Sequence, residues 1–167
     1  LNAGMLVRYL LEKCKTADEV IESLTMIPIA SQQTITVMDS IGNFAVIECN
    51  CDHIDVIKPT EQDSFVVAAN GFVSPGMTGY NGIDEWHSNE RYSVAYNSLM
   101  ANKTHFSVEL AKDILSGKYG FMCQYDRNLG VDTVWSVIYD VKNKRIFRVE
   151  GNPSRKKFVE DSRMKFI

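Results

Sequence analysis

Apolar residues near the start of the chain recur at intervals of three and four positions, which is the period of an amphipathic helix. The apolar stripe consists of Met5, Leu6, Tyr9, Leu10 and Cys14. It predicts a helix that ends near Lys15 and turns Arg8 and Glu12 towards solvent.

A second helix is predicted by the sequence TADE at residues 16–19, which has the form of a capping box. In this motif the threonine hydroxyl accepts a hydrogen bond from the backbone amide of the glutamate, and the glutamate side chain reaches back towards the start of the helix. The helix should run to about Thr25, because Pro28 cannot continue it.

Strands are predicted where β-branched and other apolar residues alternate with polar ones or form short runs. The predicted strands cover residues 34–38, 44–49, 54–57 and 65–69. The sequence DSIGN at residues 39–43 should join the first two as a hairpin turn. Four strands in succession without a helical crossover indicate an antiparallel meander and argue against a doubly wound parallel sheet.

Helical and strand patterns return after a glycine-rich loop at residues 71–84. One helix should begin with Ser88 or Asn89 as its N-cap. The apolar face of this helix is formed by Tyr92, Ala95, Tyr96 and Leu99. A further helix should run from an N-cap at Ser107 to Gly117. The strands predicted after these two helices cover residues 133–139, 145–149 and 156–159. This order of elements predicts an α+β fold.

Length and composition are those of an ordinary globular chain. The 167 residues suffice for one substantial core, and we predict a single domain over residues 1–167. The net charge of -3 offers no basic surface for nucleic acid, and no apolar run approaches the roughly 20 residues that span a bilayer. We therefore expect no nucleic-acid partner and no membrane partner. The compartment stays open, with the cytoplasm slightly favoured.

The four cysteines are weak indicators of disulfide or metal chemistry. Cys14, Cys49, Cys51 and Cys123 could form two disulfides, but a chain of this length does not require any. Cys49 and Cys51 fall on one face of a strand, with His53 close behind. A single C-x-C pair is a weak metal signal, so a small metal protein is only an open alternative, and we expect neither metal nor cofactor.

Five segments in a fixed order carry a resemblance to a known enzyme family. They read RYLLEKCKTADEVIESL, VMDSIGNFAVIE, VVAANGF, NERYSVAYNSL and TVWSVIYDVKNKRIFRVEGNP. Together they resemble the choloylglycine hydrolase and penicillin acylase family of linear amide C–N hydrolases, nearest to the acyl-coenzyme A:6-aminopenicillanate acyltransferase branch. The resemblance implies an N-terminal-nucleophile fold, an αββα sandwich with two antiparallel sheets between helical layers. It also implies a cysteine at the mature N-terminus, whose thiolate attacks an amide carbonyl and whose α-amino group is the base.

The resemblance implies two catalytic residues in this chain, Asn70 and Arg91. By comparison with the family pattern, Asn70 helps to hold the tetrahedral intermediate and Arg91 lies beside the nucleophile. These residue types suit the chemistry, because an amide N–H can stabilise a developing oxyanion and a guanidinium lowers the pKa of a nearby thiol. We expect Gly71 to let the backbone turn and, with Phe72, to contact the substrate. The alternative is that Asn-Gly is only a turn dipeptide and that Arg91 only caps its helix face.

The terminal cysteine of this family has no match here, since residue 1 is Leu1. We therefore interpret the chain as the C-terminal portion of such an enzyme, inactive alone, which pairs with the N-terminal half of the same fold to act on a small-molecule amide. Uncovered inner faces of strands 34–38 and 44–49 should favour self-association as a homo-oligomer, most simply a dimer. A non-catalytic α+β binding or scaffold module is the alternative. Gln32 and Gln33 stand where relatives often carry Asn, and the acyl group and acceptor stay open.

Overall fold

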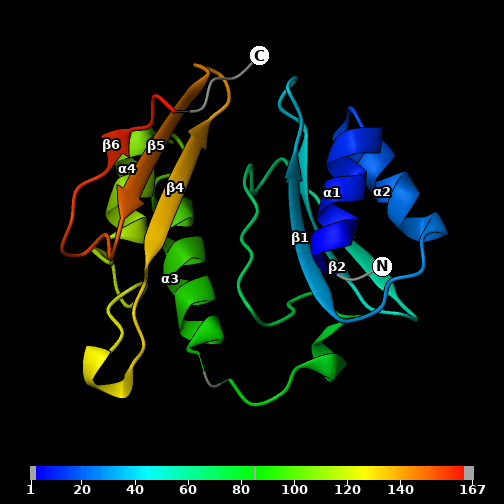
Figure 1. The fold of residues 1–167 in the computed structure, drawn as a ribbon, viewed down its shortest axis with the longest axis horizontal. Coiled ribbons are helices and arrows are strands. Elements are labelled where there is room, and N and C mark those ends of the chain that lie inside the picture. Colours follow the sequence, from blue (N-terminus) through cyan, green and yellow to red (C-terminus); the bar gives the residue numbers. More distant parts are fainter. Residues whose placement is uncertain (1–2, 85, 164–167) are drawn as a thin grey trace. The chain divides into compact units, whose positions relative to one another are not determined.

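A computed structural model describes residues 3–84 and 86–163 of the chain (Figure 1). The chain divides into two compact units, Leu1–Asn89 and Glu90–Ile167, and each contains one three-stranded antiparallel sheet. The α+β class is therefore confirmed, whereas the single domain stays a prediction. No helix within the described ranges is long and apolar enough to cross a membrane.

Helix α1, Ala3–Lys13, opens the first unit and buries only part of its predicted stripe. Leu6 and Leu10 are 1% and 5% exposed and enter the core, whereas Met5 and Tyr9 stay 58% and 39% exposed. The predicted stripe was therefore too wide, because this helix contacts the sheet along the narrow line of i and i+4 positions. Arg8 and Glu12 lie on the solvent side as predicted.

The predicted cap of the second helix is confirmed. Helix α2, Ala17–Met26, begins where the Thr16 hydroxyl accepts from the Glu19 amide at 3.2 Å. The Glu19 carboxylate accepts from the backbone amide of Lys15 at 2.6 Å, one residue earlier than the ideal capping box would place this bond.

The first sheet has the order β1-β2-β3 and is antiparallel, as the meander predicted. Its strands are β1 (Gln33–Met38), β2 (Phe44–Cys49) and β3 (Ile54–Ile57). Helices α1 and α2 cover one face, where Leu6, Leu10, Val20, Leu24, Ile29, Ala45, Ile47 and Cys49 form the core (Figure 1). The hairpin turn is held by Asp39, whose carboxylate accepts from the amides of Ile41 at 3.1 Å and Asn43 at 2.9 Å.

Two expectations about this sheet are wrong. Residues 65–69 form no strand, although Phe65 is 9% exposed. An apolar run indicates only that its residues tend to be buried. Here Phe65 is buried by packing, without pairing to a neighbouring strand. The strand at 44–49 has no uncovered face either, because residues 45–49 are all buried. Of the two strands on which self-association was predicted, β1 is the one with exposed residues, so the homo-oligomer loses half of its stated basis and stays a prediction.

The second unit is built on the sheet β4-β5-β6, with α4 packed against β4. Its elements are α3 (Ser88–Ala101, with two residues in the first unit), α4 (Val108–Leu115), the 3-10 turn Arg127–Leu129, β4 (Trp135–Asp140), β5 (Arg145–Glu150) and β6 (Val159–Glu160). The Ser107 cap is confirmed, since its hydroxyl accepts from the Leu110 amide at 3.1 Å. Strand β6 starts later than predicted, because the amides of Arg155 and Lys156 form a turn onto the Asn152 carbonyl.

A polar cluster around Asp132 fixes this C-terminal turn. The Asn152 side chain is 3% exposed and donates to the Cys123 carbonyl and, at 2.7 Å, to Asp132 Oδ1. The Arg155 guanidinium contacts both Asp132 oxygens at 2.7 and 2.5 Å. The hydrogen bond from Asn152, followed by that from Arg155, holds the pKa of Asp132 below its ordinary value.

Asp132→Asn should destabilise the protein at neutral pH, and the loss should disappear in acid. A carboxylate with a lowered folded pKa stabilises the fold fully above the ordinary Asp pKa of about 3.9, and this contribution is lost as pH falls through the lower folded value. Urea unfolding of both proteins between pH 3 and 7 measures the difference. Asp126→Asn is the matched control, because asparagine can still accept from the Asn128 amide. A pH-independent difference would contradict the role of the charge.

Candidate active site

A polar pocket of about 200 Å³ in the first unit contains three of the four predicted site residues. It is lined by Gln32, Asn70, Gly71, Phe72, Tyr80, Asn81, Gly82, Ile83, Asp84, Trp86, Ser88 and Asn89. The Asn70 residue is exposed, whereas Phe72 is only 7% exposed. Asn70 therefore lies on the open side of the pocket, and Phe72 contributes mainly to the buried wall.

The chain after Asn70 is anchored through its backbone by side chains from other segments. The Gly71 amide donates to Ser88 Oγ at 2.6 Å, and the Phe72 amide donates to Asn81 Oδ1 at 2.7 Å. The Asn81 amide group also donates to the Phe72 carbonyl at 2.8 Å, so one side chain satisfies both backbone groups. These bonds anchor the backbone directly after Asn70.

The conformational reason predicted for Gly71 does not apply, whereas its contact with substrate stays a prediction. Its φ is not in the left-handed region, so no turn at this position requires glycine. A Cβ at Gly71 would instead lie 3.3 Å from Ser88 Oγ, which is tighter than most side-chain contacts. Glycine therefore permits the close approach of residue 88 that anchors its own amide.

Glu48 anchors the next two residues from within the sheet. Its side chain is buried, with the residue 1% exposed, on the face of β2 opposite to Ile47. The carboxylate accepts from the Val73 amide at 2.8 and 3.0 Å and from the Ser74 amide at 2.9 Å. It also accepts from the Ser74 hydroxyl at 2.6 Å. Four successive backbone amides, 71 to 74, are thus held by side chains.

The far wall of the pocket is ordered by Asp84. Its carboxylate oxygens accept from the amides of Ser88 at 2.6 Å and Asn89 at 2.9 Å, at the start of α3. A carboxylate at a helix N-terminus satisfies unpaired amides and interacts favourably with the helix dipole. The prediction of Ser88 or Asn89 as the cap was wrong, because both belong to the helix and Ser88 uses its hydroxyl to hold Gly71.

The sequence drew attention to Asn70 but not to the side chains that anchor residues 71–74, which follow it. Glu48 offered a signal, since it is the single charge within the apolar run FAVIEC. Asn81 and Ser88 offered none, because their importance depends on contacts with residues 9 and 17 positions away. Gln32 lies in the pocket wall, where its amide donates to the Tyr80 carbonyl at 3.5 Å, beside the 3-10 turn η1, Thr78–Tyr80.

Arg91 lies in α3, within the second unit, and is half-buried. Asn70 belongs to the first unit, so the convergence of these two side chains on one cleft stays a prediction.

None of the first unit's cysteines lines this pocket. Cys49 is buried, and burial raises the pKa of its thiol to about 11. The pKa of Cys51 is raised by the hydrogen bond and the charge of Asp52. A thiol with a raised pKa is protonated at neutral pH and is a poor nucleophile. Within residues 3–84 and 86–163, no three His, Cys, Asp or Glu side chains gather as metal ligands, and this includes Cys49, Cys51 and His53.

Comparison with known proteins gives one result. The family model described as Acyl-coenzyme A:6-aminopenicillanic acid acyl-transferase matches residues 1–155. No curated protein and no solved structure matches the chain. The matched range includes every residue of the polar pocket, together with Glu48 and Arg91.

Proposed function

Since the chain belongs to the Acyl-coenzyme A:6-aminopenicillanic acid acyl-transferase family, we propose that it forms the oxyanion-stabilising part of a cysteine enzyme acting on linear amide C–N bonds. The family relationship is to N-terminal-nucleophile enzymes that hydrolyse amides or transfer their acyl groups. The two antiparallel sheets, with their helices, would belong to the αββα sandwich of that fold. We also propose the position of the nucleophile and the roles of Asn70 and Arg91.

The observation that carries the proposal is the anchoring of the segment that follows Asn70. An exposed amide side chain lines a polar pocket, and the next four backbone amides are held by Ser88, Asn81 and Glu48. A donor on a backbone anchored in this way would stabilise a developing oxyanion with little reorganisation during the reaction, which is the main advantage of an enzyme site over water.

We assign the nucleophile to a segment outside these 167 residues, at a mature N-terminus. An internal cysteine has no α-amino group to act as its base. The cysteine of the second unit, Cys123, is 2% exposed, and burial raises the pKa of its thiol. The external thiolate would attack the amide carbonyl, and the resulting oxyanion would accept from Asn70. Collapse would release the amine with a proton and leave a thioester, which water or a second amine would then cleave.

Arg91 is assigned to the thiolate. A guanidinium beside a thiol favours the charged form and lowers the pKa of the thiol, so the nucleophile is ionised at neutral pH. This role does not require Arg91 to contact the carbonyl oxygen. Its loss should therefore change the pH dependence of kcat/KM, whereas the loss of Asn70 should lower kcat.

The test compares this 167-residue chain with the full-length polypeptide on a series of N-acyl p-nitroanilides. The chain alone should release no nitroaniline, whereas the full-length protein should do so. Arg91→Ala in the full-length protein should shift the rising limb of the pH profile of kcat/KM towards alkaline pH, because the thiol loses its positive neighbour. Arg8→Ala, at an 81% exposed side chain, is the control and should leave the profile unchanged.

Two results would contradict parts of the proposal. Turnover by the purified chain alone would place the nucleophile within these residues. An unchanged pH profile in Arg91→Ala, with normal folding, would remove Arg91 from the site while leaving the assignment of Asn70 to its own test.

A further inference from the structure

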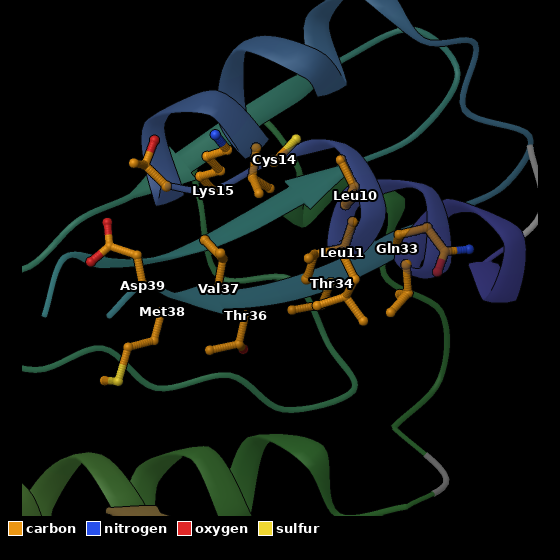
Figure 2. Close-up of a pocket in the computed structure, with 14 residues that line it drawn as sticks. Leu10, Leu11, Cys14, Lys15, Gln33, Thr34, Thr36, Val37, Met38 and Asp39 are labelled. Carbon is orange, nitrogen blue, oxygen red and sulfur yellow. The ribbon is translucent and has the colours of Figure 1, made fainter. Parts of the chain in front are cut away.

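A second hollow in the first unit runs along the outer edge of β1 (Figure 2). It has a volume of about 290 Å³ and is lined by Val7, Leu10, Leu11, Cys14, Lys15, Thr16, Val20 and every residue from Gln33 to Asp39. No residue of β2 lines it. Successive side chains of a strand point to opposite faces, so a hollow that touches all of them follows the edge of the strand and not one face. We call it the β1 groove.

The backbone edge of β1 beside this groove is open to pairing with another strand. Strand β1 ends the sheet order β1-β2-β3, so alternate backbone groups point away from β2. Within the part of the chain that the structure describes, the backbone of residues 33–38 makes no hydrogen bond outside the sheet. The sequence QTITVM contains no charge and no proline, which are the usual means of blocking an edge strand.

Helix α1 adds an apolar wall to this edge. Leu11 and Val7 line the groove although 79% and 46% of their surface is exposed. Ile35 and Val37 of β1 pack against the core cluster but are only partly buried. Figure 2 shows Leu10 and Leu11 near the Gln33 end of β1, with Cys14 and Lys15 towards the Asp39 end. A strand laid beside β1 would therefore be covered by α1 along one face.

The positive charge of Lys15 at one end of the β1 groove favours an occupant with a negative charge there. The Lys15 ammonium is exposed and has no hydrogen bond or ion pair to any of the described residues. The neighbouring Asp39 does not pair with it, because its carboxylate is occupied by backbone amides of the hairpin turn, including those of Ile41 and Asn43. An occupant with an acidic side chain at this end would pair with Lys15.

We propose that the β1 groove binds an extended polypeptide segment as a fourth strand, with apolar side chains at alternate positions and an acidic residue beside Lys15. The open backbone groups favour a polypeptide, since an acyl chain would fill the groove without satisfying them. A second copy of β1 is less suitable, because QTITVM has no acidic side chain to offer to Lys15. This inference concerns a surface separate from the polar pocket and does not depend on the proposed reaction.

Binding of two fluorescein-labelled hexapeptides, Glu-Val-Thr-Val-Thr-Val and Val-Thr-Val-Thr-Val-Glu, to the 167-residue chain tests the proposal by fluorescence anisotropy. Two peptides are used because parallel and antiparallel addition place the acid at opposite ends. One should bind saturably, and the composition-matched Glu-Val-Val-Val-Thr-Thr should not. Hydrogen exchange should slow at alternate amides of residues 33–38, which a purely apolar ligand would leave unprotected.

Substitutions at the groove supply the controls. Leu11→Lys should weaken peptide binding about tenfold, whereas Ile41→Lys, at a residue equally exposed at 79% but in the hairpin turn, should not. Lys15→Glu should weaken binding about fivefold, and Lys13→Glu should not. Circular dichroism confirms that these surface variants are folded.

Three outcomes would overturn the proposal. The first is the absence of saturable binding to the unmodified chain by either peptide. The second is displacement of the peptide by dodecanoate without any amide protection, which would make the groove a fatty-acid site. The third is self-association of the chain that is lost in Leu11→Lys, which would make a second copy the occupant.

Discussion

Under the proposed function, Asn70→Ala in the full-length polypeptide should lower kcat for amide cleavage by about 10²- to 10³-fold, with little change in KM. An oxyanion forms only on the way to the tetrahedral intermediate, so a donor aimed at it stabilises the transition state more than the bound substrate. Steady-state kinetics with the N-acyl p-nitroanilides measure both constants.

Asn97→Ala is the matched control for this substitution, because Asn97 is an exposed asparagine of α3 that does not line the polar pocket. It should leave both constants within about twofold of the unmodified enzyme. A raised KM with an unchanged kcat in Asn70→Ala would show that Asn70 binds the ground-state substrate. In that case the oxyanion assignment would be wrong even if the enzyme hydrolyses amides.

Glu48→Ala should lower the free energy of unfolding by roughly 3 kcal/mol or more. The substitution removes the acceptor of the Val73 and Ser74 amides and of the Ser74 hydroxyl, and it leaves these buried or half-buried donors without that partner. It also opens a cavity where the residue is 1% exposed. Urea unfolding followed by circular dichroism measures the change.

Glu61→Ala provides the comparison, since Glu61 is exposed in the loop after β3, and it should change stability by less than about 0.5 kcal/mol. Amide exchange adds a local readout. Protection should fall at Val73 and Ser74, whose amides donate to this carboxylate, in Glu48→Ala but not in Glu61→Ala. Stability equal to that of the unmodified chain would mean that the segment after Asn70 is held without this carboxylate.

Elements specified by neighbouring residues were predicted well from the sequence. The Thr16 and Ser107 caps each involve an amide only three positions away, and the β1–β2 turn is closed by Asp39 within the hairpin itself. The β4–β5 hairpin was found for the same reason. In each case the decisive hydrogen bond lies inside the window that a pattern of propensities and spacings covers.

The errors concern contacts between distant parts of the chain. The run at residues 65–69 has strand composition, but strand formation needs an edge to pair with, and nothing in the run itself shows whether one is available. The stripe on α1 was drawn too wide, because the width of the buried face depends on how the helix meets the sheet. Met5 and Tyr9 therefore stay exposed although their spacing fits.

The sequence by itself determined the α+β class, the first antiparallel meander, the caps and the choice of Asn70 as the residue to examine. Tertiary structure decided how the backbone after Asn70 is held. The partners of the amides that follow it come from Ser88, Asn81 and Glu48, which are 17, 9 and 25 positions from the residues that they bind. Local propensity carries no information about such separations, since each bond forms only when packing brings two segments together. The β1 groove arose in the same way, because the edge of a strand becomes a site only once a helix is placed beside it.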